Sequence, residues 1–411
     1  MARPQRTSGP CMPLRVLVID RSPPISLRQG NALIGVEVLS RLAAHHDLTL
    51  VAPATVDERE AAAQHLGGIF RAMHLVPRTR WTPAIAGSVE AGLAGRLGSA
   101  PGLDLPASRA LSRCIRELGV AGTYDVLHVR QLPMAGYGAA IRSAGRLLEL
   151  IDSETLGAER ARPKTWRTRL RARLAASVER RAMDRFDVVT TVADADAARL
   201  RALQPTARVD VVPNGVDAAR FRADPHVTAA PSSLVFVGAM AYPPNVAAMR
   251  YFTDEVLPIV RRNRPDARLT IVGRDPAPMV RAMASEGVEV TGEVDDVRPY
   301  LAAAGIFVAP MVSGSGIKNK VLEAMAMARP VVATPLAVEG LRVRNGENVL
   351  VADSPAGLAD AIERLIADAK ERARIGDGGR ALVERAYTWD ACAARYEGIY
   401  QELAERSERT R

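Results

Sequence analysis

The sequence predicts an α/β protein with two parallel-sheet domains, and three observations support this prediction. Short apolar runs, typical of strands buried on both faces, alternate with helical patterns in both halves of the chain. A Pro/Ala/Ser-rich stretch over residues 223–233 separates the two series as a linker would. At 411 residues the chain is long enough for two domains. In such sheets ligands bind beyond the carboxyl ends of the strands, so the residues that follow the strands are site candidates.

The first half opens with residues 1–12, which we expect to be a disordered lead. A strand over 14–19, a helix over 32–44 and a strand over 48–52 predict a βαβ unit with a right-handed crossover. Gly30 lies in the loop of this unit, where a plain turn glycine and a ligand-contacting glycine are equally good interpretations. Further strands are predicted over 73–76, 124–129, 147–151 and 187–192.

Two polar residues stand at the ends of predicted strands in this half. Arg130 follows the run YDVLHV, and Asp152 follows the run LLELI. Their positions make both of them candidates for contact with an acceptor substrate. His128 lies inside its apolar run, so we interpret it as a core histidine rather than a catalytic one.

Residues 159–185 are strongly basic and have helical spacing. One face of the predicted helix is apolar and carries Leu170, Leu174, Val178 and Ala182. The opposite side carries Arg169, Arg173 and Arg180. A solvated arginine face is the first interpretation of this pattern. Peripheral contact of the basic 160–185 region with an anionic membrane is the sharper alternative.

The second half repeats the strand and helix alternation. The run at 209–212 with the following PNGVD predicts a hinge, and helices are expected from about 355 to 406. Strands are predicted over 234–237, 269–272, 288–291, 306–309, 331–333 and 349–352. The predicted domains are therefore 13–208 and 209–386, followed by a terminal helix over 387–411. Two such domains joined by a short hinge imply a cleft between them.

The stretch over residues 306–335 predicts a strand, a glycine-rich loop, a helix and another strand. Lys318, Lys320 and Glu323 stand in or near the first turns of this helix. Backbone N–H groups at a helix start favour an anion, and the two lysines add positive charge. A carboxylate suits the vicinal hydroxyls of a ribose. A tight turn with solvated lysines is the alternative, but this combination of residues favours a nucleotide site.

The overall charge and the cysteines narrow the classes of partner. The net charge of +9 suggests a phosphate-bearing substrate, an anionic membrane or nucleic acid. No aromatic–glycine or helix-turn-helix pattern favours nucleic acid, so we expect no such partner. Three cysteines without pairing or metal spacing fit a reducing compartment. Without a signal peptide or a long apolar run, the expected location is cytoplasmic, including the inner face of the membrane.

Five motifs resemble those of family 4 glycosyltransferases. They are VVPNGVD (211–217), FVGAMAYPPN (236–245), LTIVGRDP (269–276), VTGEVDDVRPYL (290–301) and GSGIKNKVLEAMAMARPVVAT (314–334). The resemblance implies the GT-B fold, in which two Rossmann-like domains face each other across a cleft. The run YTWDACAARYEGIYQEL also resembles the terminal helix that crosses back to the first domain in these enzymes.

The resemblance implies transfer of a sugar from a nucleotide diphosphate sugar, a UDP- or GDP-sugar, with retention at the anomeric carbon. It implies neither a cofactor nor a metal ion. The acceptor would be a lipid-linked glycan or a small molecule, in the biosynthesis of cell-surface glycans or glycosylated natural products.

The resemblance also assigns roles to individual residues. Lys318 and Lys320 would face the diphosphate as catalytic residues, and Glu323 would bind the ribose. Gly30 would approach the donor from the first domain. The remaining donor-binding residues would be Arg274 and Val294 near the base, and Gly314, Ser315, Gly316 and Ile317 along the sugar and phosphate.

The chain departs from the common pattern of this family at four places: in the first half, Gly30 remains of a usual glycine pair and Arg130 replaces a common histidine. The other two departures lie in the second half. Ser315 stands where many members carry the first glutamate of Glu-x7-Glu, and AMAYPPN replaces a usual Arg and Lys. Lys318 and Lys320 compensate in charge, as in the branch with a glycine-rich loop. Two alternatives stay open: a nucleotide-sugar epimerase of the same fold, and a non-catalytic protein that binds nucleotide sugars.

Overall fold

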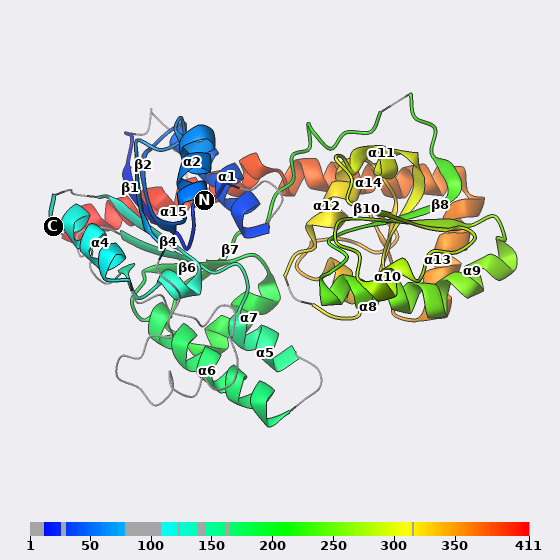
Figure 1. Cartoon of the computed structure of the whole chain (residues 1–411), viewed down its shortest axis with the longest axis horizontal. Coiled ribbons are helices and arrows are strands. Elements are labelled where there is room, and N and C mark those ends of the chain that lie inside the picture. Colours follow the sequence, from blue (N-terminus) through cyan, green and yellow to red (C-terminus); the bar gives the residue numbers. More distant parts are fainter. Residues whose placement is uncertain are drawn as a thin grey trace, which may run out of the picture. The chain divides into compact units, whose positions relative to one another are not determined.

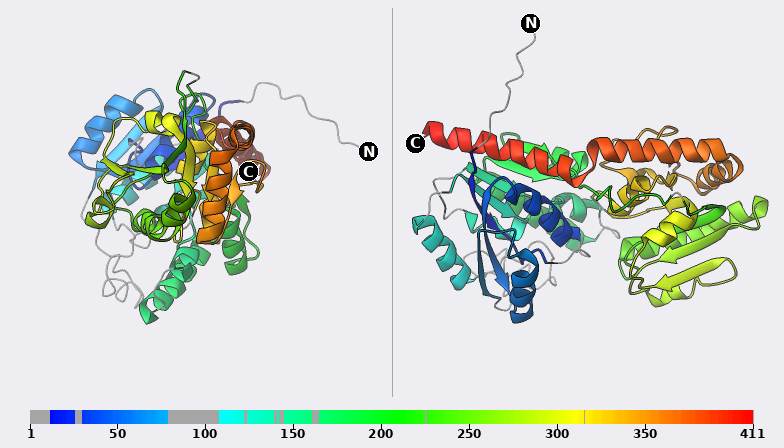
Figure 2. Two further views of the ribbon diagram at one scale, coloured as in Figure 1. Left: turned by 90° about the vertical axis from the view of Figure 1, so that its right-hand side faces the viewer. Right: turned by 90° about the horizontal axis from the view of Figure 1, so that it is seen from above.

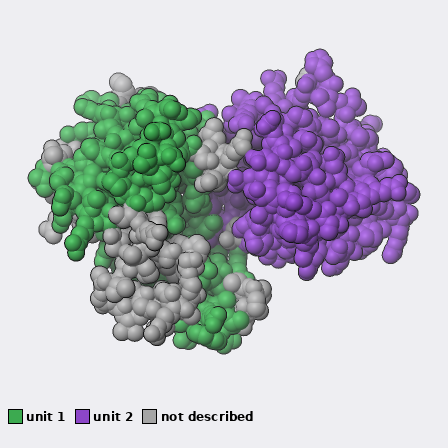
Figure 3. Space-filling model, viewed as in Figure 1, with its two compact units in different colours: residues 1–191, 197–210, 393–411 green, residues 192–196, 211–392 purple. Residues whose placement is uncertain are grey.

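The computed structural model forms two compact units (Figure 3). Unit 1 holds residues 1–191, 197–210 and 393–411, and unit 2 holds residues 192–196 and 211–392. The structure describes residues 12–25, 30–78, 108–121, 124–138, 141, 145–160, 165–224, 226–314 and 316–410. The predicted disordered lead falls almost wholly outside these ranges.

Unit 1 is built on a seven-stranded sheet within the described residues, in the order β3-β2-β1-β4-β5-β6-β7 (Figure 1). Its strands are β1 Arg15–Ile19, β2 Asp47–Ala54, β3 Ala72–Pro77, β4 Val126–Arg130, β5 Gly145–Glu149, β6 Val188–Thr191 and β7 Val209–Val211. The pairings from β3 through β6 are parallel. Strands β1 and β4 are almost completely buried, as their continuous apolar runs predicted.

Helices surround this sheet and join its strands. They are α1 Gly30–Ala43, α2 Val56–Leu66, α4 Arg109–Ala121, α5 Glu154–Arg160, α6 Trp166–Met183, α7 Asp194–Leu203 and, at the chain end, α15 Trp389–Thr410. A short 3₁₀ turn, Leu132–Met134, follows β4. Helix α15 approaches the first residue of β5 closely, because a Cβ added at Gly145 would lie 2.8 Å from the backbone oxygen of Leu403. The part of α15 from residue 393 onward therefore belongs to unit 1.

Unit 2 has a six-stranded parallel sheet in the order β10-β9-β8-β11-β12-β13. Its strands are β8 Ala230–Val237, β9 Arg268–Val272, β10 Val288–Gly292, β11 Ala304–Ala309, β12 Val331–Ala333 and β13 Leu350–Val351. The predicted linker over 223–233 is too long, because Ala230 pairs with Ala304 and opens β8. The parallel sheets of both units confirm the predicted α/β class.

Helices cover both faces of the unit 2 sheet (Figure 2). They are α8 Pro243–Tyr251, α9 Leu257–Asn263, α10 Pro278–Arg281, α11 Arg298–Ala303, α12 Asn319–Ala326, α13 Pro355–Ala367 and α14 Ala369–Ala386, with a π turn at Phe252–Val256 and a 3₁₀ turn at Pro335–Val338. Within the described ranges, no helix combines the length and the apolar character that crossing a membrane would require.

Candidate functional site

The predicted strand–loop–helix stretch is confirmed at the carboxyl end of β11 in unit 2. The loop carries Gly314 and Gly316 with φ angles of +110° and +69°, in the left-handed region that glycine adopts readily. Helix α12 begins at Asn319, directly after Lys318. The N–H groups of its first turn have no partner inside the helix, so this end of α12 favours an anion.

Glycines in the two neighbouring loops let their backbones approach each other and the first turn of α12 closely. Gly238 follows β8 and Gly273 follows β9, the next strand in the sheet. A Cβ added at Gly273 would lie 1.7 Å from the carbonyl oxygen of Gly238. A Cβ added at Gly238 would lie 2.9 Å from Nζ of Lys320. The backbones of these loops therefore come close to each other and to Lys320 only because side chains are missing there.

The side-chain ammonium of Lys320 is largely desolvated. Its Nζ donates a hydrogen bond of 2.5 Å to Oδ1 of Asn245 and lies 4.3 Å from the ring centroid of Phe236. Burial lowers the pKa of Lys320 to about 7, against the opposing effect of Glu323. Among the described carboxylates, none forms an ion pair with this ammonium. A half-buried, largely desolvated cation without a paired anion marks a place where an anionic ligand would be stabilised.

Asn245, near the start of α8, positions this ammonium. Its side chain is buried, and its Nδ2 donates a hydrogen bond of 2.9 Å to the carbonyl oxygen of Ala239. That bond directs Oδ1 of Asn245 toward Lys320. Sequence reasoning missed this role, since it interpreted the stretch AMAYPPN only as the loss of two basic residues. Lys320 and Asn245 are 75 positions apart, and no local pattern connects them.

Glu323 lies one helical turn beyond Lys320 and is partly buried. Burial raises the pKa of its carboxyl group, while the cations of Lys320 and Arg220 lower it. Lys318 is buried, and its Nζ donates a hydrogen bond to the carbonyl oxygen of Gly316. Lys318 thus braces its own loop, and Lys320 presents its charge among the three loops. The assignment of both lysines to a diphosphate stays a prediction.

Two other donor-side candidates, Arg274 and Val294, also follow the carboxyl ends of strands in the unit 2 sheet. Arg274 is the second residue after β9, and its carbonyl oxygen accepts a hydrogen bond of 2.8 Å from Met240 N–H. Val294 is the second residue after β10. Both residues are half-buried, and Ile317 is buried. Ser315 lies outside the described residues, so its role stays a prediction, as do the roles of Arg274 and Val294.

Asn214 is a second residue that sequence reasoning did not place in this site. It belongs to the motif PNGVD, is buried, and its Nδ2 donates a hydrogen bond of 3.0 Å to Oδ1 of Asn319. The hinge residues therefore hold the first residue of α12, 105 positions further along the chain.

The structure corrects the prediction for Arg130, which does not lie where an acceptor could reach it. The residue ends β4, and its side chain is 1% exposed. It forms ion pairs with Asp20 and, at 2.8 Å, with Glu149, and it donates a hydrogen bond of 3.1 Å to the carbonyl oxygen of Asn31. The two carboxylates raise the pKa of Arg130 above its ordinary value despite its burial. They hold it inside unit 1.

His128 is confirmed as a core histidine. It is fully buried, and its Nδ1 and Nε2 lie 2.7 Å from Oη of Tyr400 and 3.0 Å from Oε2 of Glu149.

Two further candidates from the first half are Gly30 and Asp152. Gly30 is the first residue of α1, and Asp152 is half-buried in the turn after β5. Their assignments to the donor and the acceptor stay predictions.

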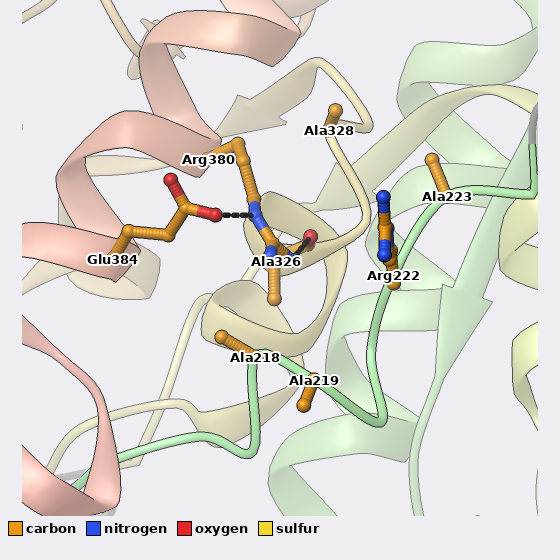
Figure 4. Close-up of a pocket in the computed structure, with 8 residues that line it drawn as sticks. All are labelled: Ala218, Ala219, Arg222, Ala223, Ala326, Ala328, Arg380 and Glu384. Carbon is orange, nitrogen blue, oxygen red and sulfur yellow. Dashed lines mark hydrogen bonds and ion pairs between the residues drawn. The ribbon is translucent and has the colours of Figure 1, made fainter.

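A separate cavity of about 560 Å³ lies at the opposite end of α12 (Figure 4). Its lining residues are Ala218, Ala219, Arg222, Ala223, Ala326, Ala328, Arg380 and Glu384. Arg380 forms an ion pair of 2.6 Å with Glu384 and donates hydrogen bonds to the carbonyl oxygens of Phe221 and Ala326. Arg380 thus satisfies a carbonyl group at the end of α12, and this cavity is distinct from the glycine-rich loop.

Two family models match the chain, one in each half. The model described as "Glycosyltransferase Family 4" matches residues 36–220, and the model described as "Glycosyl transferases group 1" matches residues 231–368.

Among curated proteins, the chain is similar to the phosphatidyl-myo-inositol mannosyltransferase of Mycobacterium leprae, with 26% identity over 72% of this chain and 78% of the relative. It is also similar to the GDP-mannose-dependent alpha-(1-6)-phosphatidylinositol monomannoside mannosyltransferase of Mycobacterium tuberculosis. Identity there is 32% over 54% of this chain and 63% of the relative.

Solved structures share the fold across almost the whole chain. Sucrose-phosphate synthase from Thermosynechococcus elongatus has a TM-score of 0.69 at 17% identity, covering 95% of this chain and 99% of that one. HepE from Anabaena, in complex with UDP, has a TM-score of 0.68 at 16% identity, covering 95% and 100%. Two parallel-sheet units together with these matches define a glycosyltransferase with the GT-B fold. The chain belongs to the family 4 glycosyltransferases, as its motifs predicted.

Proposed function

We propose that the protein transfers a sugar from a UDP- or GDP-sugar to an acceptor, with retention and without a metal ion. The observation that carries this proposal is the half-buried ammonium of Lys320, which is unpaired by any described carboxylate and lies beside the glycine loops. A diphosphate would supply the missing negative charge. The backbone between Gly314 and Lys318 would donate hydrogen bonds to the same group.

In this proposal the protein stabilises charge rather than forming a bond to the sugar. As the bond between the sugar and the diphosphate breaks, negative charge grows on the departing phosphate oxygens. Lys320 and the first N–H groups of α12 face that charge, and a fixed arrangement of such donors needs little rearrangement during reaction. Glu323 would accept hydrogen bonds from the ribose, with Arg274 and Val294 near the base.

The donor and acceptor classes come from the named relatives. One of them is GDP-mannose-dependent, and both act on phosphatidylinositol lipids according to their names. A solved structure of HepE holds UDP-glucose. We therefore propose GDP-mannose as the first donor to test and a lipid-linked acceptor of cell-surface glycan biosynthesis, with UDP-glucose as the second donor.

Isothermal titration with GDP-mannose, UDP-glucose and ADP-glucose, in buffer containing EDTA, tests the donor site. We expect one of the first two to bind at a single site and to be consumed when phosphatidylinositol or a glycolipid extract is added. The configuration of the product, read by NMR of the anomeric proton, should match that of the donor. Binding that requires added Mg²⁺, or an inverted product, would contradict the proposal.

Donor binding should depend on pH through Lys320. Because the pKa of Lys320 in the empty site is about 7, its charged form is present below that pH and is lost above it. A bound diphosphate stabilises the charged form, so affinity should be highest below pH 7 and fall about tenfold per pH unit above it. Titrations of a nucleotide sugar between about pH 6 and about pH 9 measure this, since its diphosphate keeps the same charge there.

The matched control for the pH dependence is Lys320→Met, which has no proton to exchange at this position. Its weaker donor binding should vary little over the same range. A wild-type affinity that stays constant from pH 6 to pH 9 would show that Lys320 does not pair with the diphosphate.

A further inference from the structure

Helix α6 of unit 1 presents a basic face to the solvent. The helix has six arginines and one glutamate. Arg169, Arg173 and Arg180 are exposed, and Trp166, its first residue, is 64% exposed. An exposed tryptophan is unusual in a chain where aromatic residues are 4% of the total. The helix lies at the edge of unit 1, beside α5 and away from the sheet (Figure 1).

These four exposed residues lie on one side of the helix. At about 100° per residue, Trp166, Arg169, Arg173 and Arg180 fall within an arc of about 60°. The opposite side is buried and carries Ala175, Glu179, Ala182 and Met183. We call these four residues, Trp166, Arg169, Arg173 and Arg180, the basic face. It lies on the side of α6 that is not packed against the rest of unit 1.

The acidic groups around the basic face do not neutralise it. Glu179 is buried and accepts hydrogen bonds from the hydroxyl groups of Ser153 and Thr155. Glu154 of α5 forms an ion pair with Arg171, at 3.4 Å, and not with the basic face. Asp184, just beyond the helix, is exposed and accepts a hydrogen bond from Gln204. Within the described residues, none of the three arginines of the face has an ion-pair partner.

We infer that the basic face of α6 docks the protein on an anionic lipid surface. Arginines beside a membrane attract acidic headgroups, and an indole ring partitions into the boundary between headgroups and acyl chains. Peripheral binding of a helix grows with the apolar area that enters the membrane and with the attraction to anionic lipids, and this face supplies both contributions on one arc. The inference does not depend on the donor site, which lies in the other unit.

Sedimentation with vesicles of neutral phosphatidylcholine, with or without one third phosphatidylglycerol, tests the inference. Wild-type protein should bind the anionic vesicles and not the neutral ones. The triple variant R169E/R173E/R180E should lose about a hundredfold in affinity, and Trp166→Ala about tenfold. The triple variant R250E/R262E/R268E reverses three exposed arginines of unit 2 and should bind as the wild type does.

Three results would overturn the inference: equal binding to neutral vesicles, full binding by R169E/R173E/R180E, or tighter binding to duplex RNA than to anionic vesicles at the same salt. The last would assign the face to nucleic acid. If the triple variant unfolds, as judged by circular dichroism, Trp166→Ala and a salt titration of the wild type decide instead. Donor titration of each variant separates loss of lipid binding from failure of the donor site.

Discussion

Replacing Lys320 with methionine should lower the turnover of sugar transfer by about a thousandfold, the upper end of the loss when one donor to developing charge is removed. The side chain lies among three loops at the start of α12, and its ammonium is the charge that would face the departing diphosphate. Methionine fills a similar volume without the charge. Turnover measured with saturating donor, by release of the nucleotide diphosphate, reports the effect.

The same substitution should not harm folding. The low pKa of Lys320 means that the folded protein binds this proton more weakly than the unfolded chain does. The buried site therefore costs stability in full below about pH 7, and this cost declines as pH rises from about 7 toward the ordinary lysine pKa of 10.5. Lys320→Met should raise the melting temperature at pH 6 or leave it unchanged, which separates a catalytic loss from unfolding.

One lysine serves as a control for this experiment, and a second lysine gives a comparison. Lys370→Met alters an exposed lysine at the start of α14 and should leave turnover unchanged. Lys318→Met removes the brace to Gly316 and should lower turnover through the loop, with some loss of melting temperature. Full turnover in Lys320→Met would falsify the assignment of this residue to the diphosphate.

The glycine-rich loop was predictable from sequence because all of its features are local. Two glycines, two lysines and a glutamate lie within ten residues, and the apolar runs on each side fix the strand and the helix. Asn245 and Asn214 were not predictable as partners of this loop. Each of them reaches α12 through the packing of separate βα units, and a buried asparagine has many local explanations.

Arg130 shows a different limit of sequence reasoning. Its position at a strand end correctly predicted its place in the sheet, but not the direction of its side chain. Arg130 pairs in register with Glu149 on β5, and Asp20 follows β1 on the other side of β4. The glutamate inside the apolar run LLELI was the available signal. A carboxylate buried in one strand calls for a cation on a neighbouring strand.

Replacing Glu149 with glutamine should destabilise the protein by about 3 kcal/mol, the lower end expected when one partner of a buried ion pair is removed. Glu149 accepts hydrogen bonds from Arg130 and contacts His128, and its pKa is lowered to about 2 because these cationic and polar partners outweigh burial. Glutamine keeps the volume, so the loss measures charge. Urea unfolding at pH 7, followed by circular dichroism, gives the free energy.

The dependence of the unfolding free energy on acidic pH should also change in Glu149→Gln. A folded-state pKa of about 2, below the ordinary value of 4.5, gives stability that is present above pH 4.5 and is lost as pH falls toward 2. Glu149→Gln should therefore lose less stability than the wild type between these two pH values. As a control, Asp47→Asn breaks the exposed ion pair with Arg71 and should cost less than about 1 kcal/mol.

A loss as small as that of Asp47→Asn would mean that Asp20 alone satisfies Arg130. A large loss would support a wider role for this network. Through His128 and Tyr400 it joins β4 and β5 to α15, and through Asn31 it fixes the start of α1 next to Gly30. The buried arginine would then act on the active protein indirectly, by holding in place the helix start that carries a predicted donor-contacting glycine. Arg130→Lys, which keeps the charge but cannot reproduce the forked hydrogen bonds, should weaken this hold while retaining part of the stability.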